Sequence, residues 1–351
     1  MNLNTGGWAS RVLTPLLRII RTSPNATVPV IAISEPVNSE TAALVNADIA
    51  IVAKGLGATL AQVPDGTAAG GDKRGPRATD LQKFRSFSTA VASGSYSVIC
   101  GGQNNLANNS YATVAGGNGN SAIGDSSAVV GGGSNTASSS YGFVGGGQSN
   151  TAQSYTHATV CGGSNNMASG QYAFVGGGQY NTANSQHSAI MGGRRGTTRS
   201  IIGYHVFPAC NAPIFDSTGL TQSALLLLGR QTTNATPTVL ASDGNVASTT
   251  NQVILPNNAA YSFTGEVIAG VVAGGNTARW TISGAIKRGG GTTAMVGTPT
   301  VTMTHNDAGA AAWVVNVTAD TTNGGIAVTV TGAASTTIRW VCKINTTEMT
   351  F

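Results

Sequence analysis

The chain has 351 residues, of which 48 are glycine and only 9% carry a charge. Its formal net charge of +5 is small and dispersed, which argues against a nucleic-acid-binding protein. A folded surface with so few charges must consist mainly of Ser, Thr and Asn, and the length suffices for two or three compact units.

Residues 1–30 are predicted to be an attachment arm with a short amphipathic segment over residues 8–20. This segment could dock on another protein or pack on the chain's own assembly. Pro15 and Arg18 interrupt its apolar run and no small-residue cleavage site follows, so we expect no signal peptide. No stretch approaches the roughly 18 apolar residues of a spanning helix, so we expect no membrane span.

Residues 31–90 are predicted to form a β-rich collar, with strand-like runs at 48–54 and 58–63. The charged triplet Asp-Lys-Arg at 72–74 could link chains of an oligomer or lie in a solvated loop.

Seven copies of one phrase, aromatic-x-x-Val/Ile-x-Gly-Gly-x-x-Asn-x-Ala, occupy residues 96–193. The aliphatic anchors recur every fifteen residues, with one spacing of sixteen, at Ile99, Val114, Val129, Val144, Val160, Val175 and Ile190. The Gly-Gly pairs begin at Gly101, Gly116, Gly131, Gly146, Gly162, Gly177 and Gly192. The asparagines are Asn105, Asn120, Asn135, Asn150, Asn166 and Asn181. A fixed period of this length predicts a β-solenoid.

We predict that residues 91–196 form this β-roll, with two strands of roughly five residues per coil and a corner at each Gly-Gly pair. The asparagines of successive coils are expected to form a ladder of side-chain amides. Each coil offers about one aliphatic residue and one alanine to its interior, which compensates poorly for ordering residues at about 1–2 kcal/mol each. We therefore expect an obligate homo-oligomer.

The repeat phrase over residues 96–193 resembles the left-handed β-roll head of trimeric autotransporter adhesins and of phage tail-fibre proteins that share it. Residues 63–82 resemble the segment that leads into the repeats of many phage tail-fibre proteins. The resemblance implies a homotrimer in the tail of a virion, assembled in the host cytoplasm, and it implies no catalytic residue.

Residues 197–220 are predicted to be a connector, and residues 221–351 an antiparallel β-sandwich or jelly roll, because several segments alternate with a period of two. Trp280, Trp313 and Trp340 are in phase with the inward aliphatic residues of these segments. We expect them in the core rather than on a ligand-binding surface.

The cysteines form no CxxC or Cys/His cluster, so neither a zinc site nor a disulfide framework is predicted. Cys100 and Cys161 share one phase of the repeat but lie four coils apart, about 19 Å, beyond the reach of a disulfide. We expect both to be small buried residues.

We expect no catalysis, no cofactor and no metal site. Tailspikes that cleave polysaccharide need paired carboxylates, and the only acidic residue between Asp80 and Asp216 is Asp125. His157 and His187 occupy the aromatic position of the repeat, where we expect them to act as packing residues.

The function predicted from these features is adhesion by a trimeric phage tail fibre or tailspike. Residues 1–90 would attach to a tail, adaptor or baseplate protein, and the distal region would bind host-surface polysaccharide or protein. The candidate contacts are loop residues, which solvated turns would also explain: Arg288, Thr292, His305, Asn306 and Asn323. A bacterial trimeric surface adhesin, a polysaccharide-depolymerising tailspike and a purely structural head fibre remain alternatives.

Overall fold

The computed structural model describes residues 18–20, 30–32 and 57–351. The chain divides into two compact units, residues 1–51 and residues 52–351.

The first unit contains two short strands, β1 (Arg18–Ile20) and β2 (Val30–Ala32), which pair antiparallel. Most of the predicted attachment arm lies outside the described residues, as does the strand predicted at residues 48–54.

The described residues are strands and turns with one short 3-10 helix, η1 (Ala308–Ala310), and no α-helix occurs among them. The all-β prediction is thus confirmed for this part of the chain. No helix in the described ranges is long and apolar enough to cross a membrane.

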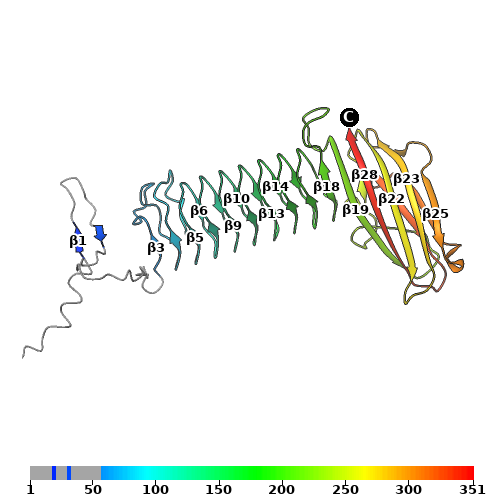
Figure 1. Ribbon diagram of the computed structural model, residues 1–351, viewed down its shortest axis with the longest axis horizontal. Coiled ribbons are helices and arrows are strands. Elements are labelled where there is room, and N and C mark those ends of the chain that lie inside the picture. Colours follow the sequence, from blue (N-terminus) through cyan, green and yellow to red (C-terminus); the bar gives the residue numbers. More distant parts are fainter. Residues whose placement is uncertain (1–17, 21–29, 33–56) are drawn as a thin grey trace, which may run out of the picture. The chain divides into compact units, whose positions relative to one another are not determined.

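The repeats lie in a β-solenoid of about nine turns, whose short strands stack into two parallel sheets (Figure 1). The first sheet contains β3 (Thr59–Leu60), β4 (Thr79–Asp80), β5 (Val98–Ile99), β7 (Thr113–Val114), β9 (Ala128–Val129), β11 (Phe143–Val144), β13 (Thr159–Val160), β15 (Phe174–Val175), β17 (Ala189–Ile190) and β18 (His205–Pro208). The second contains β6 (Leu106–Ala107), β8 (Ser121–Ala122), β10 (Thr136–Ala137), β12 (Thr151–Ala152), β14 (Met167–Ala168) and β16 (Thr182–Ala183).

Most solenoid strands have two residues, fewer than predicted. The aromatic residue of the phrase lies in the turn before the strand, where Tyr111, Tyr141 and Tyr172 have φ of 58°, 57° and 57°. A left-handed backbone does not continue into an extended strand, so the strand begins only after this turn.

The solenoid begins before the repeat phrase does. Strand β3 pairs in parallel with β4, and β4 with β5, so the parallel sheet already runs through the segment predicted to be a separate collar. Arg74, expected on the surface or between chains, is instead buried, with its Nε 2.8 Å from Asp80 Oδ2. Arg85 Nη2 lies 3.5 Å from the same carboxylate oxygen, which is also buried.

Each coil buries more side chains than the sequence suggested. In a representative coil Ser127, Val129, Asn135 and Ala137 are all at most 1% exposed. The interior of a coil therefore contains an asparagine and a small residue besides the predicted aliphatic residue and alanine.

The buried asparagines bond to the backbone and not to one another. Asn135 Nδ2 donates to the carbonyl oxygens of Gly131, in the same coil, and Gly147, in the next, at 2.8 and 2.9 Å. Its Oδ1 accepts from the backbone N–H of Asn150 at 2.9 Å. The expected amide ladder is therefore wrong, because the hydrogen-bonding groups of each side chain bond to the backbone of its own coil and of the next.

The same column is closed at both ends by other residues. At the start, Gln82 Oε1 accepts from the backbone N–H of Asn105 at 2.9 Å. At the far end, Asn181 Oδ1 accepts from the backbone N–H of Gly196 at 2.8 Å. The hydrogen-bond pattern thus extends past the repeat phrase in both directions.

The two glycines of each corner have different surroundings. Gly132, the second of its pair, has φ of +82°, and a Cβ there would lie 2.0 Å from the carbonyl oxygen of Gly147. Gly131, the first, would place a Cβ in open space. Only the second glycine is therefore required by the close approach of successive coils.

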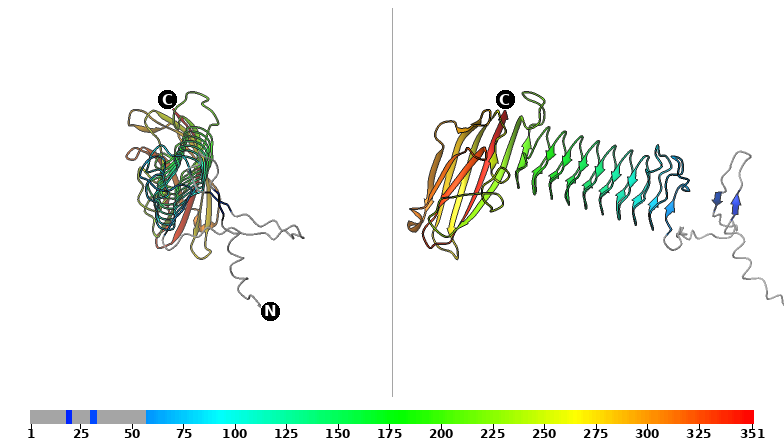
Figure 2. Two further views of the ribbon diagram at one scale, coloured as in Figure 1. Left: turned by 90° about the vertical axis from the view of Figure 1, so that its left-hand side faces the viewer. Right: turned by 180° about the vertical axis from the view of Figure 1, so that it is seen from behind.

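The first sheet continues without a break into the C-terminal region. Strand β18, within the predicted connector, pairs in parallel with β17 and antiparallel with β19 (Thr221–Thr232). Antiparallel strands follow in the order β19, β28 (Ile338–Thr350), β22 (Ala259–Val271) and β23 (Thr277–Arg288), and β24 (Thr293–Met295) and β25 (Thr300–Asn306) both pair with β23. Figure 2 shows these long strands at the end of the solenoid.

A second antiparallel sheet lies in the same region, with β27 paired to each of the other strands. It contains β20 (Thr238–Val239), β21 (Val253–Ile254), β26 (Val314–Asp320) and β27 (Gly325–Thr331).

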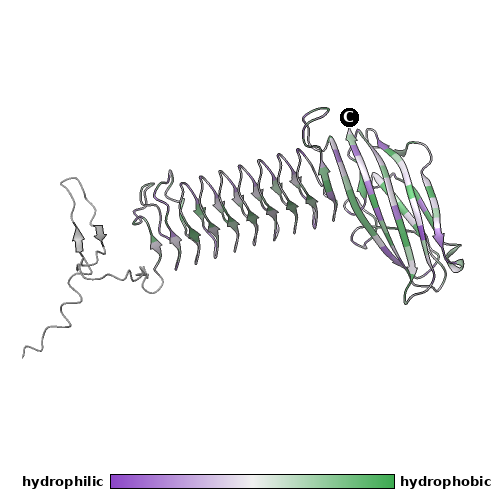
Figure 3. Cartoon of the chain, viewed as in Figure 1, coloured by the Kyte–Doolittle hydropathy of each residue, from purple (hydrophilic) through white to green (hydrophobic). Residues whose placement is uncertain are grey.

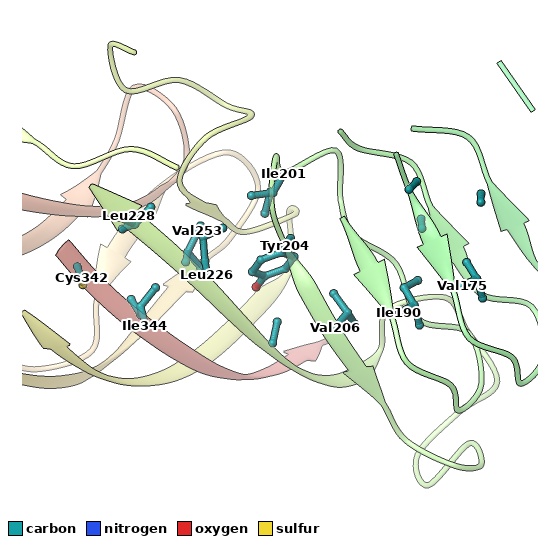
Figure 4. Packing of buried hydrophobic residues seen from close by; sticks show 14 of the residues in the cluster. Val175, Ile190, Ile201, Tyr204, Val206, Leu226, Leu228, Val253, Cys342 and Ile344 are labelled. Atoms are coloured by element: carbon teal, nitrogen blue, oxygen red, sulfur yellow. The ribbon is translucent and has the colours of Figure 1, made fainter. Parts of the chain in front are cut away.

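The buried core is continuous from the coils into this region. Figure 4 shows Val175, Ile190 and Val206 of the solenoid followed by Tyr204 and then Leu226. Figure 3 shows hydrophobic residues on the solenoid strands and alternation along the longer strands.

The three tryptophans are at most 3% exposed, so their predicted place in the core is confirmed. The ring centroids of Trp280 and Trp313 lie 5.6 and 5.7 Å from that of Trp340.

We predict that Asn135→Ala lowers the free energy of unfolding by about 2–4 kcal/mol, because a buried N–H of the next coil loses its acceptor and two carbonyls lose a donor. The matched control is Asn108→Ala, an exposed asparagine, for which we expect a change within about 0.5 kcal/mol. Urea unfolding followed by circular dichroism measures both. Equal effects would contradict the role given to the buried asparagine.

We also predict that Gly132→Ala destabilises the solenoid by more than about 2 kcal/mol, since it adds a left-handed alanine and a clash with a backbone carbonyl. The neighbouring Gly131→Ala should change stability by less than about 1 kcal/mol. Thermal melts of the two variants, made side by side, would refute the distinction if their midpoints fell together.

Candidate functional site

The outer face of the first solenoid sheet is apolar. It consists of the residues directly before and after each anchor between β5 and β17, of which two are threonine and none is charged. We call this the apolar face: Val98, Cys100, Thr113, Ala115, Ala128, Val130, Phe143, Gly145, Thr159, Cys161, Phe174, Gly176, Ala189 and Met191. Val130 and Met191 are 51% and 55% exposed in the single chain.

The corresponding outer face of the second sheet is mostly polar. Its outward residues are Leu106, Asn108, Ser121, Ile123, Thr136, Ser138, Thr151, Gln153, Met167, Ser169, Thr182 and Asn184. Two sheets of the same solenoid thus present opposite chemistry, as expected if one face packs against protein and the other faces water.

Three of the four cysteines are on the surface of the single chain. Cys100, Cys161 and Cys210 are exposed, so the predicted burial of the first two is wrong for the single chain. The residue that follows an inward anchor on a strand points outward, which places both on the apolar face. Cys342 is buried, and burial raises the pKa of its thiol to about 12. The described residues contain no group of three His, Cys, Asp or Glu side chains that could hold a metal ion.

The aromatic residues of the repeat form a stack on the surface. The ring centroids of Tyr141 and His157 lie 4.8 Å apart, those of His157 and Tyr172 5.1 Å, and those of Tyr172 and His187 5.0 Å. The histidines therefore pack between or beside tyrosines, as predicted from their phase.

The predicted receptor-binding residues do not form one site. Arg288 donates from Nη1 to the carbonyl oxygen of Leu255 at 2.8 Å and lies against Gly324. It shares this end of the sheet with Thr292 and Asn323, and Asn323 Nδ2 donates to Asp320 Oδ2 at 2.8 Å within its own turn.

His305 and Asn306 lie at the opposite end of β23. His305 pairs with Arg279, next to a β-bulge, and both line an open pocket of about 590 Å³ together with Asn306 and Ile268. Arg279 is held by Glu266, with its Nη2 2.9 Å from Oε1. This pocket therefore has charged walls on an exposed sheet face.

A second pocket, of about 340 Å³, lies beside the last coils of the solenoid and includes Tyr155 and Gln186. No sequence motif predicted this pocket. The signal that could have found it is the single spacing of sixteen residues between Val144 and Val160.

A buried carboxylate joins the last coil to the C-terminal strands. Glu348 on β28 is 2% exposed, and its Oε2 accepts from Gln222 Nε2 at 2.8 Å. Arg199 Nε lies 3.1 Å from the same oxygen, and the Tyr204 hydroxyl donates to Oε1. Burial raises the pKa of Tyr204 well above its ordinary value, and the Glu348 carboxylate raises it further. The Glu348 side chain thus links β28 to the last coil and to β19.

We predict that Tyr204→Phe makes the stability of the protein less sensitive to alkaline pH. Above the unfolded tyrosine pKa of about 10 the unfolded chain loses a proton that the folded chain keeps, so stability contributed by Tyr204 is lost as pH rises. Urea unfolding at about pH 8 and pH 11 measures the slope.

At the lower pH the variant should be less stable by about 1–3 kcal/mol, because Glu348 loses a donor. The control Tyr111→Phe, at an exposed position, should keep the wild-type slope. A Tyr204→Phe variant with the wild-type slope would show that this hydroxyl ionises normally.

No family model matches the chain. No curated protein matches it either. Among solved structures, the crystal structure of the Acinetobacter baumannii phage AM24 tailspike protein is similar over 73% of this chain and 54% of that chain, with 10% sequence identity and a TM-score of 0.19. The chain thus spans about half the length of that tailspike, and a similarity of this size assigns no function to it.

Proposed function

We propose that the chain is the subunit of a homotrimeric tail fibre or tailspike of a phage virion, and that it works by adhesion rather than catalysis. In this proposal residues 1–90 attach to a tail, adaptor or baseplate protein, and the C-terminal end contacts the host surface. Assembly takes place in the host cytoplasm. The observation that carries the proposal is the apolar face.

The apolar face supports association of identical chains. Burial of apolar surface contributes about 25 cal/mol per Å², and an exposed strip of this kind marks an interface. The outward residues of the apolar face recur once per coil. The apolar faces of a second and a third copy can therefore pack against it coil by coil along the same length. The resemblance of the repeat phrase to trimeric β-rolls supports three copies arranged around an axis.

The solenoid supports the role of a stiff shaft. Backbone pairing continues from β17 through β18 to β19, which fixes the C-terminal region to the last coil. We propose that the two C-terminal sheets form a β-sandwich, which the contact between Trp313 and Trp340 supports. Three such regions on one rigid body would bind a repetitive surface with high avidity.

The test is a double substitution on the apolar face, Val130→Asp with Met191→Asp. We expect the wild-type protein to sediment at three times its chain mass of 35.1 kDa and the variant at the mass of one chain. The matched control, Asn108→Asp on the polar outer face, should remain trimeric. A folded wild-type protein of single-chain mass would contradict the proposal.

Thiol reactivity and cell binding complete this experiment. In the trimer only Cys210 should react rapidly with Ellman's reagent, whereas in the variant Cys100 and Cys161 should react rapidly as well.

Labelled wild-type protein should bind at least one strain of a bacterial panel, and the variant should bind at least 100-fold more weakly, since avidity is lost. Release of reducing sugar by the wild type would contradict a non-enzymatic role.

A further inference from the structure

We propose that the pocket beside the last coils binds neutral saccharide units of a host-surface glycan. The inference rests on the proposed adhesive function and gives it a site and a ligand class. The pocket has a volume of about 340 Å³ and is open to solvent. Its walls come from the turns of three successive coils and from two segments that follow them: Tyr155, Gln171, Asn184, Gln186, Ile202 and Thr250.

An irregular coil supplies the aromatic wall. The coil between Val144 and Val160 has sixteen residues, and its longer turn contains Ser154, with φ of +78°. The turn presents Tyr155, which is 64% exposed and stands outside the stacked aromatic row. The only departure from the fifteen-residue spacing among the seven anchors of the repeat phrase thus places an extra ring at this pocket.

A row of amides supplies hydrogen-bonding groups. The position before the aromatic residue is serine or aspartate in the earlier coils but Thr156, Gln171 and Gln186 here. Gln186 Nε2 donates to Gln171 Oε1 at 3.3 Å, and Gln171 Nε2 donates to Thr156 Oγ1 at 3.4 Å. Each amide has two N–H donors and a carbonyl oxygen with two lone pairs. These bonds therefore orient the amides and still leave donors and acceptors free for a ligand.

The remaining wall is fixed by the segment after the coils. Asn184 Nδ2 donates to Ser200 Oγ at 3.2 Å, and its Oδ1 accepts from the backbone N–H of Ser200 at 2.9 Å. The backbone N–H of Ile202 donates to the carbonyl oxygen of Thr250 at 2.7 Å. The pocket is therefore largely formed before any ligand enters, which lowers the cost of binding.

The chemistry of the walls selects an uncharged polyol. A tyrosine ring offers an apolar surface to the C–H face of a sugar, while amides and hydroxyls pair with its hydroxyl groups. None of the described residues that line the pocket is charged. A uronic or sialic acid would lose hydration of its carboxylate without gaining a cationic partner. The pocket with His305 has charged walls and lacks this selectivity.

Saturation-transfer NMR on the full-length protein tests the proposal, with oligomers of glucose, galactose, mannose and N-acetylglucosamine as neutral probes and hyaluronan fragments as the acidic probe. We expect transfer to at least one neutral probe and none to hyaluronan. Tyr155→Ala and Gln186→Ala should each weaken binding at least tenfold. Both residues are exposed, so the melting temperature should stay unchanged. Tyr111→Ala, at an exposed tyrosine of a distant coil, is the matched control.

Absence of transfer to every neutral probe, or unchanged binding by both pocket variants, would overturn the proposal. Failure of the pocket and failure of the adhesive function give different results. If cells still bind both pocket variants as tightly as wild type, adhesion stands and the pocket is not its site. If the wild-type protein is monomeric and binds no cells while the neutral probe still binds, the pocket stands and the adhesive role fails.

Discussion

The structure depends on a polar group buried in each coil. A coil of fifteen residues encloses too little apolar volume to hold its neighbour by hydrophobic contact alone. An asparagine in the interior solves this, because one amide can satisfy two carbonyls and one N–H of adjoining backbone. The close approach that these bonds need is possible only where the second corner glycine has no side chain, as at Gly132. The two residues therefore act as a pair.

This interior leaves the outside of the coil free to vary. The inward positions repeat almost unchanged, whereas the rows outside differ between the two sheets and between early and late coils. The apolar face, the stacked rings and the pocket at Tyr155 all use outward positions. Because β18 continues the sheet into β19, the C-terminal region is connected to the coils of the solenoid through backbone pairing.

The sequence predicted the period, the all-β class and the buried tryptophans, since each leaves a regular spacing of apolar residues. It did not predict how Asn135 bonds, because a column of asparagines is compatible with side-chain or backbone partners. The exposure of Cys100 in the single chain was not predicted, because the side of the strand on which this residue lies was not considered. Strands β3 and β4 were not recognised as coils because no repeat phrase marks them. The pocket combines segments that only the fold brings together.

Hydrogen exchange at the backbone amides of Asn120, Asn135 and Asn150 tests the central claim most directly. Each of these N–H groups donates to the side chain of the preceding asparagine. The account predicts that they exchange as slowly as the amides of the anchor strands, through opening of the solenoid as a whole. Exchange at the rate of the exposed turns would show that the asparagine column does not hold the coils together.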